Sequence, residues 1–515
     1  MTRRLLIATL LALPTTLVAQ TDTTQRATQR ATPPRDTSAA KAALGPPVRK
    51  IATASAVSTE QLGNIANVRE LSGGRLLVND GQRRRLLLMD STLRTISVVL
   101  DSLTEVVDAY GVRQGTLMAY RGDSSLFFDP TSYALLILDG EGHTARVRSI
   151  PRVRDASWLT QNNSYGWPGI DTKGRLVYRI PAEAGPPLVA PPRGVPWFPQ
   201  DPDSAFIVAI DFDTRKLDTL GSIRKPKEPY IVKRTPTGGF NFISLTNPLP
   251  STDDWALLSD GTVAFVRGRD YRVEFLGADG QMTSSPKLAF DWQAMNDDAK
   301  ARLIDSVSNA QRRQATTSYV ASMVRWVNMY NQRYPADFKA PDGWTPQAGY
   351  LKNWKLPPGV AFPLKYIYGC APGEEPTMIP TPGDAPAAPT AGPPGPQTGT
   401  PSCIPQPVTI PGNTPNAPTL RESSVMSANE LPDYRPPFAT GAVRADADGD
   451  LWIRTLPTKP VPGGPIYDIV NRKGELFDRL QLPPGYSLVG FGVGRVVYLS
   501  MRDAAGIHLA RVRLR

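Results

Sequence analysis

The chain has 515 residues, 41% of them hydrophobic, which is enough to bury a sizeable core and excludes a wholly disordered protein. Its 52 prolines are about twice the usual share and predict a fold rich in turns, with few long helices. The net charge is +11, but the basic residues are spread along the chain and alternate with apolar ones, as on the solvent faces of strands. This pattern argues against a nucleic-acid partner.

The first residues predict export. Arg3 and Arg4 precede an apolar run over residues 5–17, and Ala19 offers a small residue at the expected cleavage point. We therefore interpret residues 1–19 as a Sec-type signal peptide and expect the mature protein in the periplasm or outside the cell. The apolar run has no cysteine after it for a lipid anchor, and no later run of 18 apolar residues predicts a transmembrane segment.

Residues 20–47 are rich in Thr, Ala and Pro and lack apolar periodicity, so we expect a disordered arm. From residue 48 onward, short apolar runs alternate with Asp/Gly turns, which is typical of an all-β repeat fold. Grouping the runs in fours predicts six blades, at about 66–100, 115–150, 166–221, 254–289, 440–480 and 487–514. The last group has only three strands, and residues 48–56 (VRKIATASA) can supply the fourth and close a ring.

The predicted fold class is therefore all-β: a six-bladed β-propeller, with blades one to four and the closing strand in 48–290 and blades five and six in 437–515. The segments "PDYRPPFATGAVRADADGDLWIRT" and "GGPIYDIVNRKGELFDRLQLPPG" resemble exported bacterial six-bladed propellers of the NHL-repeat and TolB-like kind. The resemblance covers about 48–290 and 431–515 and implies the fold alone. Propellers serve as binding proteins, scaffolds, lactonases and lyases, so no single activity follows from it.

An insertion at 291–436 separates blades four and five. Asn296 is the expected cap of a helix whose apolar positions include Leu303, Val307 and Ala310. We expect an aromatic stripe further along this helix to pack on the propeller, and Pro335 to end the helix. That stripe consists of Tyr319, Met323, Trp326, Val327, Tyr330 and Tyr334. The rest of the insertion is Pro-rich, above all over 371–420, and predicts loop or polyproline II structure.

The insertion also holds the two cysteines of the chain, Cys370 and Cys403. An exported protein meets an oxidising environment, where two cysteines in one segment favour a disulfide over a reactive thiol. We therefore predict that these two residues are bonded to each other.

Most catalytic motifs are missing from the sequence. The only histidines are His143 in a turn and His508 in a terminal strand, which argues against a catalytic triad or a zinc site of histidines. The glycines of "GFGVG" at 490–494 connect two strands rather than open a helix, so they do not predict a phosphate site. These observations favour a protein that is not an enzyme and has no cofactor.

The segment "DADGD" at 446–450 resembles the start of a calcium loop. Such a loop needs a glycine where Leu451 stands and a glutamate where Pro457 stands. We therefore interpret the segment as a strand-to-strand turn.

The long connections are predicted to leave one face of the propeller. They include 181–204, 222–252 and 291–436, whereas the short turns belong to the other face. We expect the ligand, an unknown protein, peptide or carbohydrate, to meet the face with the long connections. Aromatic candidates for this contact are Trp167, Trp197, Phe198 and Trp344.

The leading hypothesis is thus a monomeric cell-envelope protein that binds or scaffolds. The alternative is a metal-dependent hydrolase or lactonase that holds a single divalent metal in the propeller channel with carboxylate and amide groups. Asp254, Asn67 and Asp171 are the candidate ligands of that metal.

Overall fold

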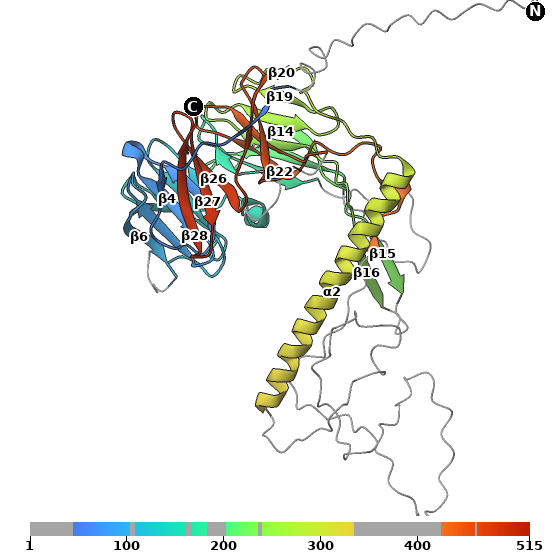
Figure 1. Cartoon of the computed structure of the whole chain (residues 1–515). Coiled ribbons are helices and arrows are strands. Elements are labelled where there is room, and N and C mark those ends of the chain that lie inside the picture. The colour runs from blue at the N-terminus through green and yellow to red at the C-terminus, as the bar shows by residue number, and fades with distance from the viewer. Residues whose placement is uncertain are drawn as a thin grey trace, which may run out of the picture. The chain divides into compact units, whose positions relative to one another are not determined.

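The structure is a computed structural model (Figure 1), which describes residues 45–102, 109–160, 166–182, 202–234, 239–333, 424–458 and 461–514. Over these ranges the chain is mostly β, with one long α-helix and three short 3-10 helices. None of the helices in the described ranges has the length and apolar character needed to cross a membrane.

Four antiparallel sheets come from the N-terminal part of the chain, each built from strands that follow one another in sequence. The first contains β3 (Ile65–Glu70), β4 (Leu76–Asp80), β5 (Arg85–Met89) and β6 (Thr95–Asp101). The second contains β7 (Thr116–Ala119), β8 (Ser125–Asp129), β9 (Ala134–Leu138) and β10 (Thr144–Ser149). The third contains β11 (Gly169–Ile170), β12 (Leu176–Pro181), β13 (Ser204–Ile210) and β14 (Leu217–Arg224). The fourth contains β17 (Asp254–Leu257), β18 (Val263–Arg267), β19 (Arg272–Leu276) and β20 (Met282–Ser284).

The fifth and sixth sheets combine C-terminal strands with strands from the N-terminal segment. The fifth contains β22 (Phe438–Ala445), β23 (Leu451–Thr455), β24 (Ile466–Val470) and β25 (Leu476–Gln481), with β1 (Val48–Lys50) added in parallel to β25. The sixth contains β26 (Tyr486–Gly492), β27 (Val496–Arg502) and β28 (Ile507–Arg513), with β2 (Ala56–Val57) as its fourth strand.

The segment expected to close the sixth sheet is therefore divided between two sheets. Only its end, at Ala56, pairs with β28, whereas its start, at Val48, extends the fifth sheet. The two pairings attach the N-terminal segment to both C-terminal sheets. This removes the edge that β28 would otherwise expose.

Six clusters of buried apolar side chains each lie between two sheets. Five of them join successive sheets, from the first pair to the last pair. The remaining cluster joins the first sheet to the sixth, and includes Leu76 and Val78 of β4 with Tyr498 of β27. The first strands of neighbouring sheets are also in contact: β3 meets both β26 and β7, β7 meets β11, and β17 meets β22. The first strand of each of these sheets is therefore an inner strand.

Short turns of one type connect many of the strands. Each turn begins with an aspartate or an asparagine. Its side-chain oxygen accepts the backbone N–H groups two and four residues later, and the turn usually contains a glycine with positive φ. In the turn at 446–450, Asp446 accepts the N–H groups of Asp448 and Asp450, and Gly449 has φ of 91°. The interpretation of "DADGD" as a strand-to-strand turn is thus confirmed.

A second, smaller body comes from the connections between the third and fourth sheets and between the fourth and fifth sheets. It holds β15 (Tyr230–Arg234), β16 (Phe240–Thr246), β21 (Ser424–Val425) and the 37-residue helix α2 (Asp297–Arg333), which Figure 1 shows in green, orange and yellow. Segment 222–252 was predicted as a long connection, and it does connect the third sheet to the fourth, with the hairpin of β15 and β16 within it.

The start of α2 is as predicted. The Asn296 side-chain oxygen accepts the N–H of Ala299 at 2.9 Å, which is the expected N-cap bond. Leu303 packs in an apolar cluster with Leu249 and Met426, but Ala310 is exposed, so the buried stripe ends after the first turns. The side chains of the aromatic stripe and Pro335 lie outside the described residues.

Candidate functional site

Trp167 lies at the centre of the sheets, two residues before the inner strand β11. Gly166 precedes it with φ of 90° and contacts Trp255 so closely that a Cβ atom there would lie 2.1 Å from the indole nitrogen. Only glycine fits such an approach at positive φ. The glycine therefore lets the loop turn against the fourth sheet and sets the position of Trp167.

Arg444 of the inner strand β22 meets this tryptophan. Its guanidinium carbon lies 4.2 Å from the centroid of the Trp167 indole ring and 5.3 Å from that of Phe491 on β26. Its Nη1 and Nη2 donate to the backbone oxygens of Leu488 and Val489 at 2.9 and 3.3 Å. The guanidinium thus joins the third, fifth and sixth sheets where their inner strands face one another.

No acidic group among the described residues pairs with the charge of Arg444. Within the part of the chain that the structure describes, no carboxylate lies at ion-pair distance from it, and burial lowers its pKa to about 10. The side chain is partly buried, and its Nε is not among the buried nitrogens that lack a partner. The Nε–H, which donates to no described group, therefore reaches accessible space.

Asp254 is the first residue of the inner strand β17. It bonds to the backbone of Val443, the residue before Arg444. It is fully buried, and its two carboxyl oxygens accept the N–H groups of Val443 at 3.0 Å and of its neighbour Trp255 at 2.9 Å. Burial raises the pKa of this carboxyl to about 7, against the opposing effects of the backbone donors and Arg179. Asp254 therefore joins the fourth and fifth sheets.

The structure does not bring the three candidate metal ligands together. Asn67 of β3 donates to the Leu117 backbone oxygen at 2.7 Å, which ties the first sheet to the second. Asp171 lies in the turn after β11, whereas Asp254 opens β17. Over the described ranges, no three acidic, histidine or cysteine residues are grouped as a metal site would require.

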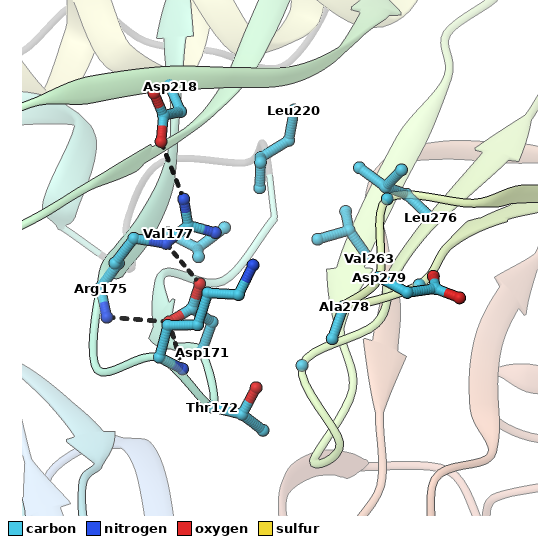
Figure 2. A pocket seen from close by; sticks show the side chains of 14 residues that line it. Asp171, Thr172, Arg175, Val177, Asp218, Leu220, Val263, Leu276, Ala278 and Asp279 are labelled. Atoms are coloured by element: carbon cyan, nitrogen blue, oxygen red, sulfur yellow. Dashed lines mark hydrogen bonds and ion pairs between the residues drawn. The ribbon is translucent and has the colours of Figure 1, made fainter.

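Asp171 instead lines a cleft of about 260 Å³ between the third and fourth sheets, at the end of the short turns. Its carboxylate accepts Arg175 Nε at 2.8 Å, and Arg175 Nη1 donates to Asp218 at 3.0 Å, as Figure 2 shows. Val177 and Leu220 form apolar walls. Because its arginine and both of these acids are bonded to one another, the cleft offers a ligand few unpaired charges.

The other candidates are distributed as follows. Trp197, Phe198, Trp344, Cys370 and Cys403 lie outside the described residues. Of the histidines, His143 is exposed in its turn, and His508 is buried with Nδ1 3.0 Å from the Ser58 backbone oxygen. Trp167 is thus the one predicted contact residue whose surroundings are described.

Arg444 is a residue that the sequence did not single out. Basic residues that alternate with apolar ones were interpreted as the solvent faces of strands. Arg444, Arg69 on β3 and Arg179 on β12 depart from that interpretation, because each is at least partly buried. Their position on inner strands, or beside them, could have been noticed from the strand grouping, but nothing local marks them as buried.

The long connections share one end of the sheets. Those that hold β15, β16 and α2 run from the last strand of one sheet to the first strand of the next. Trp167 and Asp254 lie at this same end, because each stands at or just before the start of an inner strand. The inner-strand contacts around Trp167 and the appended body are therefore the candidate functional region.

The stacked antiparallel sheets, joined by buried clusters, define a β-propeller scaffold. No protein-family model matches the chain, and no curated protein matches it in sequence.

Among solved structures, the chain is similar to regucalcin, a calcium-binding protein from Agrobacterium tumefaciens, with 9% identity, coverage of 91% of this chain and 98% of that one, and a TM-score of 0.32. It is similar to virginiamycin B lyase from Staphylococcus aureus, with 11% identity, coverage of 46% and 74%, and a TM-score of 0.24. It is similar to a gluconolactonase from Xanthomonas campestris, with 14% identity, coverage of 47% of this chain and 88% of that one, and a TM-score of 0.19. At these values the similarities assign neither ligand nor reaction.

Proposed function

We propose that this chain is an exported cell-envelope propeller of six blades that binds or scaffolds a protein, peptide or carbohydrate partner. The partner would meet the end of the scaffold that carries the long connections. The support for six blades is the set of buried clusters, since one lies between each pair of successive sheets and one joins the first sheet to the last. A closed ring of this kind leaves rigid inner strands and variable connections, which are the usual carriers of function.

The observation that carries the proposal is that two separate connections fold together. Gln311 of α2 bonds with Thr246 of β16, and Lys300 donates to Asp433 at 2.8 Å. β16 also pairs in parallel with β21, which lies 178 residues later by sequence number. Connections that served only to join blades would have no need of a shared cluster and a shared sheet.

The direct test removes the larger part of this body, α2 and β21, keeps the hairpin of β15 and β16, and measures binding to the envelope. A variant with residues 296–430 replaced by a short Gly/Ser linker should keep its β-rich circular dichroism, because the strands of the six sheets lie outside that range. Leu249 keeps Met295 and Leu431 but loses the other partners that α2 and Met426 supply in this variant, so a serine at 249 would keep the product soluble. We expect the variant to lose sedimentation with washed envelope vesicles.

The matched control changes the opposite end of the scaffold. Replacing Lys173 and Arg121, both exposed in short turns, by alanine should leave envelope binding unchanged. If the folded deletion variant still binds as the full chain does, or if the control variant loses binding, the proposed location is wrong.

Export and the disulfide are further proposals that rest on the sequence. The mature chain should begin near Gln20 and be found outside the cytoplasm, and N-terminal sequencing of envelope material that found Met1 intact would exclude this. Cys370 and Cys403 should form a disulfide bond. It should raise the free energy of unfolding by about 3–4 kcal/mol, because it lowers the entropy of the unfolded chain. Titration of two free thiols in the unreduced, unfolded protein would contradict it.

The metal-dependent hydrolase receives less support than the binding protein. Its candidate ligands Asn67, Asp171 and Asp254 each bond to separate protein groups, and they come from opposite ends of the inner strands. Addition of Mg²⁺, Mn²⁺ or Ca²⁺ that raised the unfolding temperature, with loss of the effect in Asp254→Asn, would restore this alternative.

A further inference from the structure

The guanidinium of Arg444 combines features that a purely structural arginine does not need. Among the described residues, backbone oxygens accept from two of its five N–H donors and no group accepts from the other three. One of its faces lies over the Trp167 ring at 4.2 Å. A cation held among apolar groups without a counter-charge costs free energy, and a bound anion would offset that cost.

The neighbouring groups do not supply this anion. Asp254 bonds to Val443, the residue before Arg444, but its two oxygens accept the N–H groups of Val443 and Trp255. Among the described residues, Tyr467 is the ionisable group that acts on the pKa of Arg444, and it raises that pKa against the larger effect of burial. The site therefore holds an arginine fork with unused donors, bordered by two aromatic rings, Trp167 and Phe491.

We propose that Arg444, Trp167 and Phe491 form a subsite for a small carboxylate that carries a flat or ring-shaped apolar group. The carboxylate accepts two N–H groups of the guanidinium, since arginine binds carboxylates with two parallel hydrogen bonds. The apolar group packs against the indole or phenyl ring. This subsite deepens the proposed binding function and rests on it. Trp167 stands before the start of β11, whereas Arg444 and Phe491 stand near the ends of β22 and β26, so the subsite lies along the inner strands.

Arg444 also selects among ligands in this arrangement. Its two carbonyl bonds and its stacking on Trp167 fix the fork before any ligand arrives, so little side-chain entropy is lost on binding. A neutral amide of the same shape would place an N–H₂ group against N–H donors and leave them unpaired. The subsite should therefore prefer a carboxylate to its amide by about tenfold or more.

The test uses benzoate and benzamide as probes of the full chain in isothermal titration. Benzoate should bind saturably, and benzamide about tenfold more weakly or not at all. Arg444→Met keeps an unbranched apolar stem but removes the charge and the fork, and should weaken benzoate at least tenfold. Arg444→Lys keeps the charge without the fork and should give an intermediate affinity. Trp167→Leu should weaken benzoate while keeping its preference over benzamide.

The control variant is Arg472→Met, which removes an arginine that is paired with Asp260 at 2.8 Å in exposed turns. Its benzoate affinity should equal that of the unchanged protein. Because Arg444 joins three sheets, circular dichroism and unfolding temperature must first show that Arg444→Met is folded. If it is not, the comparison of Arg444→Lys with Arg472→Lys takes its place.

Two results would overturn the subsite: no saturable benzoate binding by the unchanged protein, or equal affinity in Arg444→Met and Arg472→Met. Arg444 would then act only in joining the inner strands. The envelope assay separates this failure from that of the proposed function. Benzoate binding through Arg444 together with envelope binding by the deletion variant would keep the subsite and exclude the appended body as the partner's location.

Discussion

Glycines in the short turns differ in what surrounds them, and the difference can be measured. Gly474 has φ of 77°, and a Cβ atom there would lie 2.2 Å from the Cβ of Ser285, a buried residue whose hydroxyl accepts the N–H of Val273. Gly280 has φ of 83° in a comparable turn, with nothing within 4 Å of the same position. Alanine at either site adopts a strained backbone, but only alanine at 474 also collides with its neighbour.

We therefore predict that Gly280→Ala lowers the free energy of unfolding by about 1 kcal/mol and Gly474→Ala by about 2–4 kcal/mol. Urea unfolding followed by circular dichroism measures both values. Equal losses in the two variants would mean that Ser285, which follows β20 of the fourth sheet, moves away from the new methyl group without cost.

Asp254 predicts a pH dependence of stability. Its pKa in the folded protein is about 7, above the ordinary value of 3.8, because burial disfavours the charged form. The folded protein then keeps the proton between about pH 4 and 7, while the unfolded chain releases it. This contribution to stability is complete below pH 4 and is lost as the pH rises toward 7, at up to about 1.4 kcal/mol per pH unit.

Asp254→Asn removes the titration but adds a constant cost, because its amide nitrogen would face a backbone N–H group. The measurement is the difference in unfolding free energy between the unchanged protein and this variant, taken by urea titration from pH 5 to pH 7.5. We expect the difference to shrink as the pH rises. A difference that stays constant would show that Asp254 is ionised throughout this range.

At the scale of elements, a buried hydrogen-bond network joins the fourth sheet to the fifth. The Tyr271 hydroxyl donates to Asp468 Oδ2 at 2.7 Å, and Arg479 Nε donates to Asp468 Oδ1 at 2.9 Å. Asp468 is 1% exposed, and burial raises its pKa, while Arg479 and the tyrosine hydroxyl act in the opposite direction. Loss of one donor would leave a carboxylate oxygen buried without a partner.

Tyr271→Phe should thus lower the free energy of unfolding by about 1–3 kcal/mol. The matched variant is Tyr133→Phe, whose ring is 41% exposed, and it should change stability by less than about 0.5 kcal/mol. Chemical unfolding of both proteins in one buffer makes the comparison. A similar result for the two would show that water replaces the lost hydroxyl beside Asp468.

The elements that the sequence predicted are those with regular signals. Strands such as Leu76–Asp80 and Leu451–Thr455 are apolar runs bounded by Asp/Gly turns, so the apolar residues and the turn residues together predicted their positions. The helix start at Asn296 followed from its cap. The hairpin of β15 and β16 also has two β-rich runs on either side of a Pro/Gly turn, but it lies outside the grouping of strands in fours and was interpreted as part of a connection.

The site was less predictable than the strands. Trp167 was expected because a large aromatic residue beside a loop is a common contact residue, and its location needed only the strand grouping. Arg444 depends on three sheets meeting around one guanidinium, and such long-range packing leaves no local pattern. Trp197 and Trp344 lie outside the described residues and remain predictions.

At the scale of the whole molecule, the two ends of the described chain are held together by the N-terminal segment. Arg49 Nε donates to Asp478 at 3.0 Å, and the Ser58 hydroxyl accepts the N–H of Leu509 at 3.0 Å. Ile51 and Ala56 pack in clusters of the last sheets. The sequence indicated this closure because the last group of strands lacked a fourth strand and residues 48–56 could supply it. It could not show that this one segment pairs with two sheets.

The last prediction concerns this closure. A chain that starts at residue 45 should be as stable as one that starts at residue 20, whereas a chain that starts at Thr59 loses both β1 and β2. Besides the ladder pairings of β1 with β25 and β2 with β28, three further backbone hydrogen bonds go with them, from the N–H groups of Ile51, Ser55 and Ser58 to the fifth and sixth sheets. At about 1 kcal/mol each, with the apolar contacts of Ile51 in addition, we expect a loss of several kcal/mol in urea unfolding.

The shortened chain also exposes β28 as a sheet edge, so it should scatter light at concentrations where the longer chain stays monomeric. Arg49→Ala in the longer chain is the control, because Arg49 is 49% exposed and its ion pair contributes about 1 kcal/mol or less. A chain starting at Thr59 that kept full stability would mean that the cluster between the first and sixth sheets closes the scaffold unaided. The pairing of β2 with β28 would then protect an edge without holding the two ends together.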